Sequence, residues 1–308
     1  MRSTGTVSTR TRGPGTTIPF WAFVGPFLIG LVIFAYVPIV WSAALSVFNA
    51  QNTVTPDEFV GLRNYADMLT DGPFVHSLVT FSLFALFAVP LTFVLALALA
   101  VMVNQVRFAR TFFRSVFFLP TACSYVVASL VWKLSIFNGV RFGLANTVLG
   151  WFGGDTVAWL SNPNPPWYWV VLVSARLWLQ VGFYMILFIA GLQRIPTSLY
   201  EAAYVDGANP GWQVFRHITL PQLRPTSIAV LLLSLIAAYQ AFDEFYNLLG
   251  NSRGYPDFAR PPLVYLYYVA LGPNQDYGHG SAGALILALL IAMVTLLQGR
   301  LLGFGRRD

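Results

Sequence analysis

The chain has 308 residues, of which 56% are hydrophobic and only 10% are charged, and its formal net charge at pH 7 is +6. Soluble domains carry about a quarter charged residues, and here the apolar residues form long runs, so the composition excludes an ordinary soluble domain and indicates a membrane protein. The single cysteine, Cys123, excludes an intrachain disulfide, and we expect it to be a small buried residue.

The chain begins with a polar segment, residues 1–17, that is rich in Ser, Thr, Gly and Arg and has no apolar period. We predict a disordered leader there, followed by one membrane domain over residues 18–308. A membrane-spanning helix needs about 20 mostly apolar residues. Six apolar runs are long enough, and they predict an all-α membrane protein with spans at residues 20–48, 75–104, 112–136, 168–192, 226–249 and 281–303. Pro26 and Pro38 lie in the first of these runs and should bend it.

The arginines predict how these spans are oriented. An even number of spans puts both termini on one side, and most arginines fall on that side, in the terminal segments and in the second and fourth loops. Because cytoplasmic loops carry the excess of positive charge, we predict that both termini and the fourth loop, residues 193–225, are cytoplasmic. The net charge follows from this asymmetry and requires no nucleic-acid partner. The arginines on the other side are Arg63, Arg141, Arg253 and Arg260.

Motifs for catalysis are missing from the sequence. The only lysine, Lys133, does not follow the glycines of a P-loop, so this chain is not expected to bind ATP in that way. His76, His217 and His279 are far apart and lack the spacing of metal ligands. The pattern G-x-S-x-G is also absent. We therefore expect no catalytic residue, no metal site and no cofactor on this chain.

The fourth loop predicts a hairpin of two short helices. Ser198 and Glu201 fit a capping box, so the first helix should start there and run to about Asp206. Gly207 stands where a left-handed residue ends a helix, and Asn209-Pro210 predicts the start of the second helix.

The second helix of this hairpin should end at about Leu220, before Pro221. Trp212, Phe215 and Thr219 share one of its faces, because they are three and four residues apart. An aromatic face on a cytoplasmic loop must be buried, either against the protein's own spans or against a cytoplasmic partner. The pattern alone leaves both alternatives open.

The same loop resembles the EAA loop of permease subunits from binding-protein-dependent ABC importers, through "EAA" at 201–203, Gly207, Ile218 and "LP" at 220–221. Segments 59–69, 113–120, 143–153 and 190–208 also resemble the six-span permeases of maltose, glycerol-3-phosphate and related sugar importers, in particular the first of their two permeases. Ten residues separate Gly207 from Ile218, one more than is usual in that family, and we expect the extra residue in the Asn209-Pro210-Gly211 turn. A "TGGGP"-like sequence, common there after the fifth span, is replaced by "LGNSRGYPDFARPP".

The resemblance implies a type I ABC importer permease fold with a coupling-helix hairpin, in the inner membrane of a prokaryote. The chain would be a non-catalytic permease subunit that moves a sugar or a related polar solute, including the glycerol-phosphate type. ATP and Mg would bind a separate ATPase dimer, and the other partners would be a dissimilar second permease, an extracytoplasmic solute-binding protein and membrane lipid. The implied coupling residues are Glu201, Ala202, Ala203, Asp206, Gly207, Trp212, Phe215, Ile218, Leu220 and Pro221.

Two alternatives belong to other functional classes. A transporter driven by an ion gradient would need internal repeats and an ion site near the membrane midplane, and the sequence shows no convincing repeat. A membrane scaffold without transport would need no charges inside its spans.

Two charges do lie inside the predicted spans, where they are costly and by default functional. Arg176 lies about 12 Å from the outer end of its span and Asp243 about 9 Å from the outer end of the next, at 1.5 Å per residue. We predict that they form an ion pair, with a structural or a transport role. Sugars are often held by aromatic faces and hydrogen-bonding groups, which gives these candidate pathway residues: Trp178, Gln180, Tyr184, Tyr239, Gln240 and Asp243.

Overall fold

The structure is a computed structural model that describes residues 17–106, 108–209, 211–250, 256, 258–273 and 275–301. Three predictions therefore fall wholly or partly outside the described residues. They are the leader at residues 1–17, the start of the second hairpin helix at Pro210, and the end of the last span at residues 302–303.

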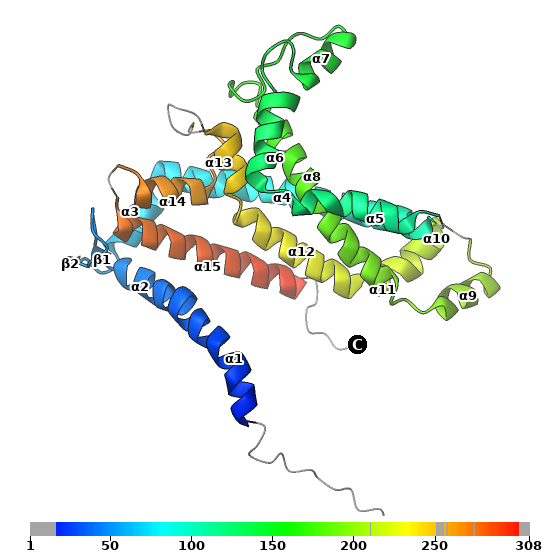
Figure 1. The fold of residues 1–308 in the computed structure, drawn as a ribbon, viewed down its shortest axis with the longest axis horizontal. Coiled ribbons are helices and arrows are strands. Elements are labelled where there is room, and N and C mark those ends of the chain that lie inside the picture. Colours follow the sequence, from blue (N-terminus) through cyan, green and yellow to red (C-terminus); the bar gives the residue numbers. More distant parts are fainter. Residues whose placement is uncertain are drawn as a thin grey trace, which may run out of the picture.

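Most of the described chain is helical (Figure 1). Its first half contains α1 (Thr17–Leu31), a π-helical turn (Val32–Tyr36), α2 (Val37–Leu45), the short antiparallel strands β1 (Phe48–Asn49) and β2 (Glu58–Phe59), α3 (Arg63–Thr70), α4 (Gly72–Gln105), α5 (Arg110–Phe118), a 3-10 turn (Leu119–Ala122), α6 (Tyr125–Val131), a second π turn (Trp132–Ile136) and α7 (Leu144–Trp151).

The second half contains α8 (Tyr168–Leu192), α9 (Thr197–Val205), α10 (Trp212–Val214), a third π turn (Phe215–Thr219), α11 (Leu220–Gln222), α12 (Arg224–Tyr239), α13 (Asp243–Leu249), α14 (Pro262–Leu271) and α15 (Tyr277–Leu301).

Four stretches of the described chain are long and apolar enough to cross a membrane: Pro19–Leu45, Gly72–Gln105, Tyr168–Leu192 and Tyr277–Leu301. Two bent pairs raise the number to as many as six if each pair is one span. The first pair joins Arg110–Ala122 to Tyr125–Ile136 with a bend of 96°, and the second joins Trp212–Gln222 to Arg224–Tyr239 with a bend of 69°. These stretches and pairs overlap all six apolar runs of the sequence. The helix α14, only 10 residues long, was not predicted.

The bend in the third predicted span has a local cause. Pro120 cannot donate a helical hydrogen bond and its ring crowds the preceding turn, so the helix tightens into the 3-10 turn. Cys123 and Ser124 then take extended backbone conformations before α6 begins. The expectation of a small buried residue at Cys123 is wrong, because this side chain is exposed at the bend.

The core of the bundle is built around α4 and α8, which pack along each other, with α12, α14 and α15 packed against α4 or against one another (Figure 1). Aromatic rings fill the centre of this packing. Phe81 and Phe84 of α4 contact Phe245 of α13 with ring centroids 5.0 and 5.3 Å apart, and Phe84 stacks on Trp169 of α8 at 5.4 Å. The bundle thus fixes α13 against α4 and α8.

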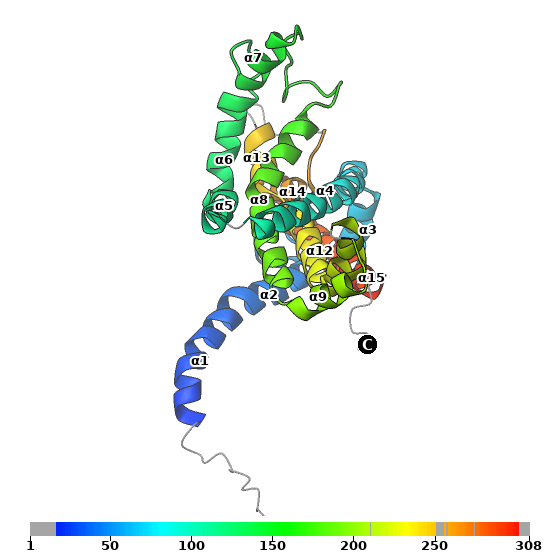
Figure 2. The ribbon, with the colours of Figure 1, turned by 90° about the vertical axis from the view of Figure 1, so that its right-hand side faces the viewer.

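The helix α1 extends away from this bundle in two perpendicular views (Figures 1 and 2). Most of its described side chains are exposed, although the stretch from Pro19 to Leu45 is strongly apolar. An apolar helix of this kind requires cover by lipid or by another chain.

The segment of residues 138–159, which contains α7, also projects from the bundle, beyond the end of α6 (Figure 1). We call it the projection. It is held together by Asn146, which is 5% exposed. Its Nδ2 lies 3.0–3.3 Å from the carbonyl oxygens of Asn138, Val140 and Val157, and its Oδ1 accepts hydrogen bonds from the Val157 amide and Trp159 Nε1 at 3.1 and 2.9 Å. One side chain thus ties the two ends of the projection together.

Replacing Asn146 with alanine should therefore loosen this projection without changing the bundle. Each buried polar group left without a partner costs about 1–3 kcal/mol. We expect amide hydrogen exchange across residues 138–159 to become at least about ten-fold faster, the equivalent of 1.4 kcal/mol. Asn162→Ala is the matched control, because the Asn162 side chain accepts one local hydrogen bond, from the Asn164 amide. Equal exchange in the two variants would contradict the role given to Asn146.

Candidate functional site

The hairpin in the fourth loop is present as two helical segments with a turn between them. The first segment is α9, and it ends at Val205, one residue before the position predicted. Gly207 has φ +83° and Gly211 has φ +111°, so both adopt backbone conformations that residues other than glycine rarely take. The predicted left-handed stop at Gly207 is confirmed.

Three details of the hairpin differ from the prediction. The second helical segment starts at Trp212 with Gly211 in the cap position, and not at Asn209-Pro210. The helix α9 starts at Thr197 with Pro196 in the cap position and no side-chain cap, so Ser198 and Glu201 do not form the expected capping box. The second helical segment does not end before Pro221. It continues to Gln222, and the π turn at Phe215–Thr219 comes directly before the segment that contains Pro221. A wider turn relaxes the helical ladder where proline lacks a donor.

The aromatic face of the hairpin is partly buried against the protein itself and partly exposed, so each of the two alternatives that the sequence left open holds for part of it. Phe215 packs against the buried cluster at the adjacent ends of α4 and α8, and Tyr200 OH lies 3.1 Å from Thr219 Oγ1 inside the hairpin. Trp212 stacks on Phe215 with ring centroids 5.6 Å apart but is 71% exposed. The inner part of the face is therefore covered by the protein itself, and the outer part is not.

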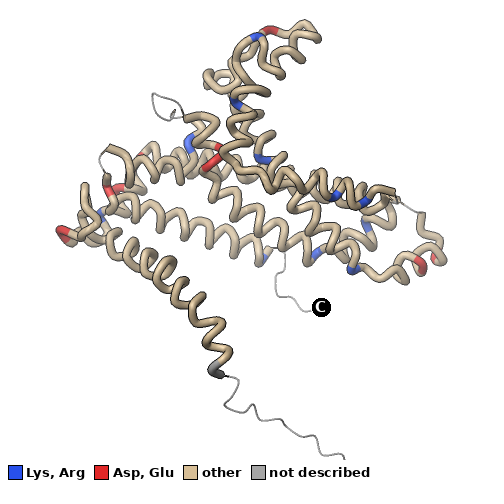
Figure 3. Tube along the Cα trace, in the orientation of Figure 1, with Lys and Arg blue, Asp and Glu red and all other residues tan. Residues whose placement is uncertain are grey.

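The ten implied coupling residues lie on this hairpin, and most of them are exposed. The exposed ones are Glu201, Ala202, Asp206, Gly207, Trp212, Leu220 and Pro221, and the half-buried ones are Ala203, Phe215 and Ile218. Arginines gather at the same end of the molecule, along α5, around α10 and α11, and at the end of α15 (Figure 3), whereas the one lysine, Lys133, lies in the π turn after α6. The hairpin thus presents a surface at the arginine-rich end.

The second feature is a break in the fifth predicted span. The helix α12 ends at Tyr239, the residues Gln240 to Phe242 are not helical, and α13 restarts at Asp243. A polar cavity of about 200 Å³ lies at this break. Its lining includes Tyr125 from α6 and Gln180 from α8, together with Gln240 and Asp243. We call it the central cavity.

The predicted ion pair between Arg176 and Asp243 is wrong by one residue. Arg176 Nη1 pairs with Glu244 Oε1, and the two side chains are only 4% and 3% exposed. Arg176 Nη2 donates a second hydrogen bond of 2.5 Å to the carbonyl oxygen of Ala237. Because the helix restarts at Asp243, the first side chain of α13 is exposed and the next, Glu244, is buried among the packed helices.

The candidate pathway residues separate into two groups. Gln180, Gln240 and Asp243 line the central cavity, and Gln180 Nε2 donates a hydrogen bond of 3.0 Å to Tyr125 OH. The other three, Trp178, Tyr184 and Tyr239, do not line it.

Each of these three packs elsewhere. Trp178 lies against the ring of Trp132 at 5.0 Å, Tyr184 is buried, and Tyr239 donates a hydrogen bond of 2.9 Å to Ser82 Oγ. Tyr125, Phe242 and Glu244 also line the central cavity and were not predicted as pathway residues. Adjacency to Asp243 could have indicated Phe242 and Glu244, whereas nothing in the sequence indicated Tyr125.

Comparison with known proteins gives a family match and several relatives. The family described as the binding-protein-dependent transport system inner membrane component matches residues 72–303. The trehalose/maltose transport system permease protein MalF of Thermococcus litoralis is 32% identical over 283 residues, which is 92% of this chain and 92% of that protein.

Two solved bacterial structures have a similar fold. One is an ABC transporter involved in the import of the acidic polysaccharide alginate, with a TM-score of 0.81 and 23% identity over 95% of this chain and 98% of that chain. The other is an alginate ABC transporter in complex with a periplasmic protein that holds an alginate pentasaccharide, with a TM-score of 0.77 and 25% identity over 93% of this chain and 94% of that chain.

Proposed function

The chain belongs to the family of binding-protein-dependent transport system inner membrane components, and from this membership we propose that it is a permease subunit of an ATP-driven sugar importer. It is a non-catalytic subunit of that machinery. The relative from Thermococcus litoralis carries trehalose and maltose in its name, and the two similar structures handle alginate. These names support a sugar as the solute, rather than an amino acid or an ion.

The observation that carries the transport role is the central cavity. It combines hydrogen-bonding side chains, two aromatic rings and ionisable groups at a place where a span is broken. Non-helical backbone at membrane depth is tolerated where it lines a cavity. A neutral sugar needs such groups for its hydroxyls. We propose that the pathway runs along Gln180, Gln240 and Asp243, and that the ion pair of Arg176 and Glu244 stabilises the helices that carry these residues.

The hairpin supports the second half of the proposal, which is coupling to an ATPase dimer. It exposes Trp212 and several neighbouring residues at the arginine-rich end, where the positive-inside rule places the cytoplasm. ATP and Mg would bind the ATPase dimer, and its closure would move the hairpin and switch the spans between inward-facing and outward-facing states. The chain itself would bind no nucleotide.

The remaining parts of the assembly follow from the same proposal. Six spans, counting each bent pair as one, would place both termini in the cytoplasm, after a leader at residues 1–17 and with the permease domain over residues 18–308. A dissimilar second permease and lipid would cover the exposed α1. A solute-binding protein would deliver the sugar from outside, as the periplasmic protein in the alginate complex supports.

Uptake in the native host tests this function. Labelled maltose, trehalose and an oligosaccharide of uronic acids would be supplied to cells with the gene deleted and then restored, and the chains that co-purify with the restored protein would be identified. We expect ATP-dependent uptake of a sugar only with the restored gene, and co-purification of an ATPase and a second permease. Uptake that persists after deletion, or that follows an ion gradient instead of ATP, would refute the proposal.

A single substitution tests the coupling role of the hairpin. Gly207→Val should lower uptake and ATPase retention, because a left-handed conformation costs a residue with a side chain about 1–2 kcal/mol, a factor of about 5–30 in an equilibrium constant. Open space surrounds Gly207, so the effect would come from the backbone and not from a collision. Glu201→Ala should be milder, since it changes an exposed side chain on α9.

Gly153→Val is the matched control for this test. Gly153 has φ +78° and open space around it, as Gly207 does, but it lies in the projection that carries α7. Both variants should insert in the membrane. If the Gly207 and Gly153 variants lose ATPase retention equally, or if neither loses it, the hairpin is not the coupling surface.

A further inference from the structure

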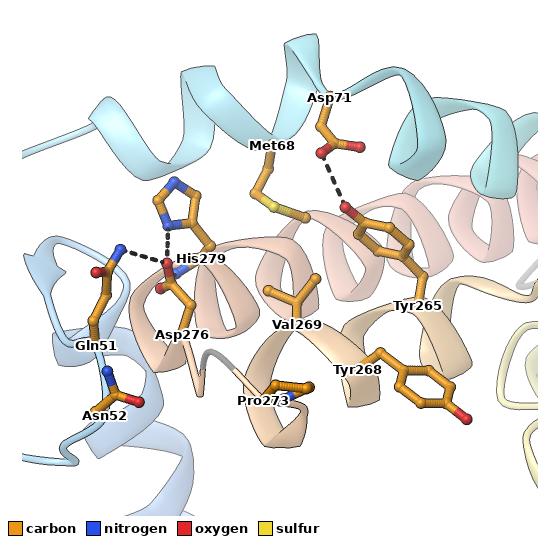
Figure 4. Close-up of a pocket in the computed structure, with 10 residues that line it drawn as sticks. All are labelled: Gln51, Asn52, Met68, Asp71, Tyr265, Tyr268, Val269, Pro273, Asp276 and His279. Atoms are coloured by element: carbon orange, nitrogen blue, oxygen red, sulfur yellow. Dashed lines mark hydrogen bonds and ion pairs between the residues drawn. The ribbon is translucent and has the colours of Figure 1, made fainter. Parts of the chain in front are cut away.

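A second cavity has a volume of about 550 Å³. Its lining residues are drawn in Figure 4, and the helices that carry them meet at the end of the bundle opposite the hairpin (Figure 1). Its lining comes from the segment after β1, from α3, from α14 and from the start of α15. By the arginine distribution this end is extracytoplasmic, so we call it the outer cavity. Its lining is largely polar and aromatic and includes Gln51, Asn52, Asp71, Tyr265, Tyr268 and Asp276.

The polar side chains of the outer cavity are held in place by contacts between distant parts of the chain (Figure 4). Gln51 Nε2 donates a hydrogen bond of 3.1 Å to Asp276 Oδ2, and His279 Nδ1 lies 2.9 Å from the same oxygen. Tyr265 OH donates a hydrogen bond of 2.9 Å to Asp71 Oδ2. Groups fixed in this way lose little freedom when a ligand binds, so the cavity is preorganised.

The outer cavity has a negative character. Two carboxylates, Asp71 and Asp276, line it, and no lysine or arginine is among the described lining residues. Asp67 Oδ2 lies 3.4 Å from His279 Nε2, and Arg63, 3.8 Å from Asp67, offsets the charge of that third carboxylate. Burial acts to raise the pKa of Asp276, but hydrogen bonds from His279 and Gln51 lower it below its ordinary value. Asp276 is therefore ionised at neutral pH and can accept hydrogen bonds from hydroxyl groups. A ligand with carboxylates of its own would be repelled.

A patch of four aromatic rings connects the outer cavity with the central cavity. Tyr268 lines the outer cavity and Phe242 lines the central one. Tyr246 lies between them, stacked on Phe242 with ring centroids 5.3 Å apart and 6.3 Å from Tyr268. Tyr267 completes the patch, at 5.5 Å from Phe242 and 5.6 Å from both Tyr246 and Tyr268. The four rings are therefore in contact with one another, partly stacked and partly edge to face, from Tyr268 at the outer cavity to Phe242 at the central cavity.

We propose that the outer cavity is a waiting site for a neutral sugar, and that the patch of Phe242, Tyr246, Tyr267 and Tyr268 guides the sugar from this site to the central cavity. The inference rests on the proposed function, because it places a second site on the same route. Stacking against ring faces tolerates many sugars, so the patch permits movement, whereas the carboxylates of the outer cavity select against acidic sugars.

Sugar binding to the full chain in lipid nanodiscs tests this inference. Saturation-transfer NMR would be recorded with maltotriose and with trigalacturonate, which has a similar size but carries three carboxylates. We expect binding of maltotriose and much weaker binding of trigalacturonate. Asp276→Asn should raise the affinity for trigalacturonate, because it removes a negative charge and keeps a polar side chain of the same shape. Equal binding of the two probes by the unchanged protein would overturn the inference.

The aromatic residues provide the second part of the test. Tyr268→Ala should weaken maltotriose binding by about ten-fold, equivalent to 1.4 kcal/mol. Tyr268→Phe keeps the ring and should retain binding. Tyr36→Ala is the control, since Tyr36 is exposed in the π turn between α1 and α2 and lines neither cavity. Absence of maltotriose binding, or unchanged binding in Tyr268→Ala, would overturn the waiting site, while sugar uptake in cells would still decide the proposed function.

Discussion

Glu244→Ala should be one of the most destabilising single substitutions in this protein. The carboxylate is 3% exposed and pairs with Arg176, whose guanidinium is 4% exposed. Removing one partner of a buried pair leaves an uncompensated charge, which costs about 3–5 kcal/mol. Arg176 also holds the Ala237 carbonyl at the end of α12, so loss of its partner would disturb the break itself. We expect a lower unfolding temperature in detergent and loss of sugar uptake.

A double-mutant cycle separates the pair from the surrounding packing. Arg176→Met and Glu244→Ala should each be harmful, and the double variant should cost clearly less than the sum, because it buries no unpaired charge. Asp243→Ala is the matched control, since it removes the neighbouring carboxylate, which is exposed. Its unfolding temperature should stay close to that of the unchanged protein. Additive costs in the cycle, or equal destabilisation by Asp243→Ala, would contradict the pairing.

Gly182→Ala should have a comparably large effect for a steric reason. A Cβ atom at Gly182 would collide with the carbonyl oxygen of Phe117, so α8 can approach the end of α5 only because position 182 has no side chain. The obstacle is backbone and cannot move by a change of rotamer. Overpacking of this kind costs about 1–3 kcal/mol, and we expect the upper end of that range.

The control for this substitution is Gly25→Ala. Gly25 also lies inside a helix, α1, but no other atom lies within 4 Å of the position that its Cβ would take. Alanine is favoured over glycine in a helix by about 1 kcal/mol, so this variant should be neutral or slightly more stable. The unfolding temperature of both variants would be measured in the same detergent. An unchanged value for Gly182→Ala would mean that α5 and α8 do not pack as the structure shows.

The positions of the spans could be predicted from the sequence because a span is a matter of length and apolarity. The same reasoning could not find α14, since 10 apolar residues are too few for the length test. It also missed the break at Gln240 to Phe242 and therefore paired Arg176 with the wrong carboxylate. Depth along an ideal helix cannot separate two adjacent residues that face different directions after a break.

In the hairpin too, some features could be predicted from local sequence and others could not. The stop at Gly207 was predictable, because the conformation at that position depends on one residue type. The start of α9 was not, since Pro196 takes the cap position and displaces the expected capping box. The contacts of Asn146 and the outer cavity join residues far apart in the sequence, such as Gln51 and Asp276, and no local pattern indicates them.

The π turn at Phe215–Thr219 is a second place, besides the Asn209-Pro210-Gly211 turn, that can hold the additional residue of the hairpin. Ten residues separate Gly207 from Ile218, one more than is usual in the family that this loop resembles. In a regular α-helix one inserted residue rotates everything after it by about 100°. A π turn can take up one inserted residue within a single wider turn, so the residues after it keep their original face. With such a turn, a hairpin that is one residue longer can still present Leu220 and Pro221 in phase with the rest of the surface.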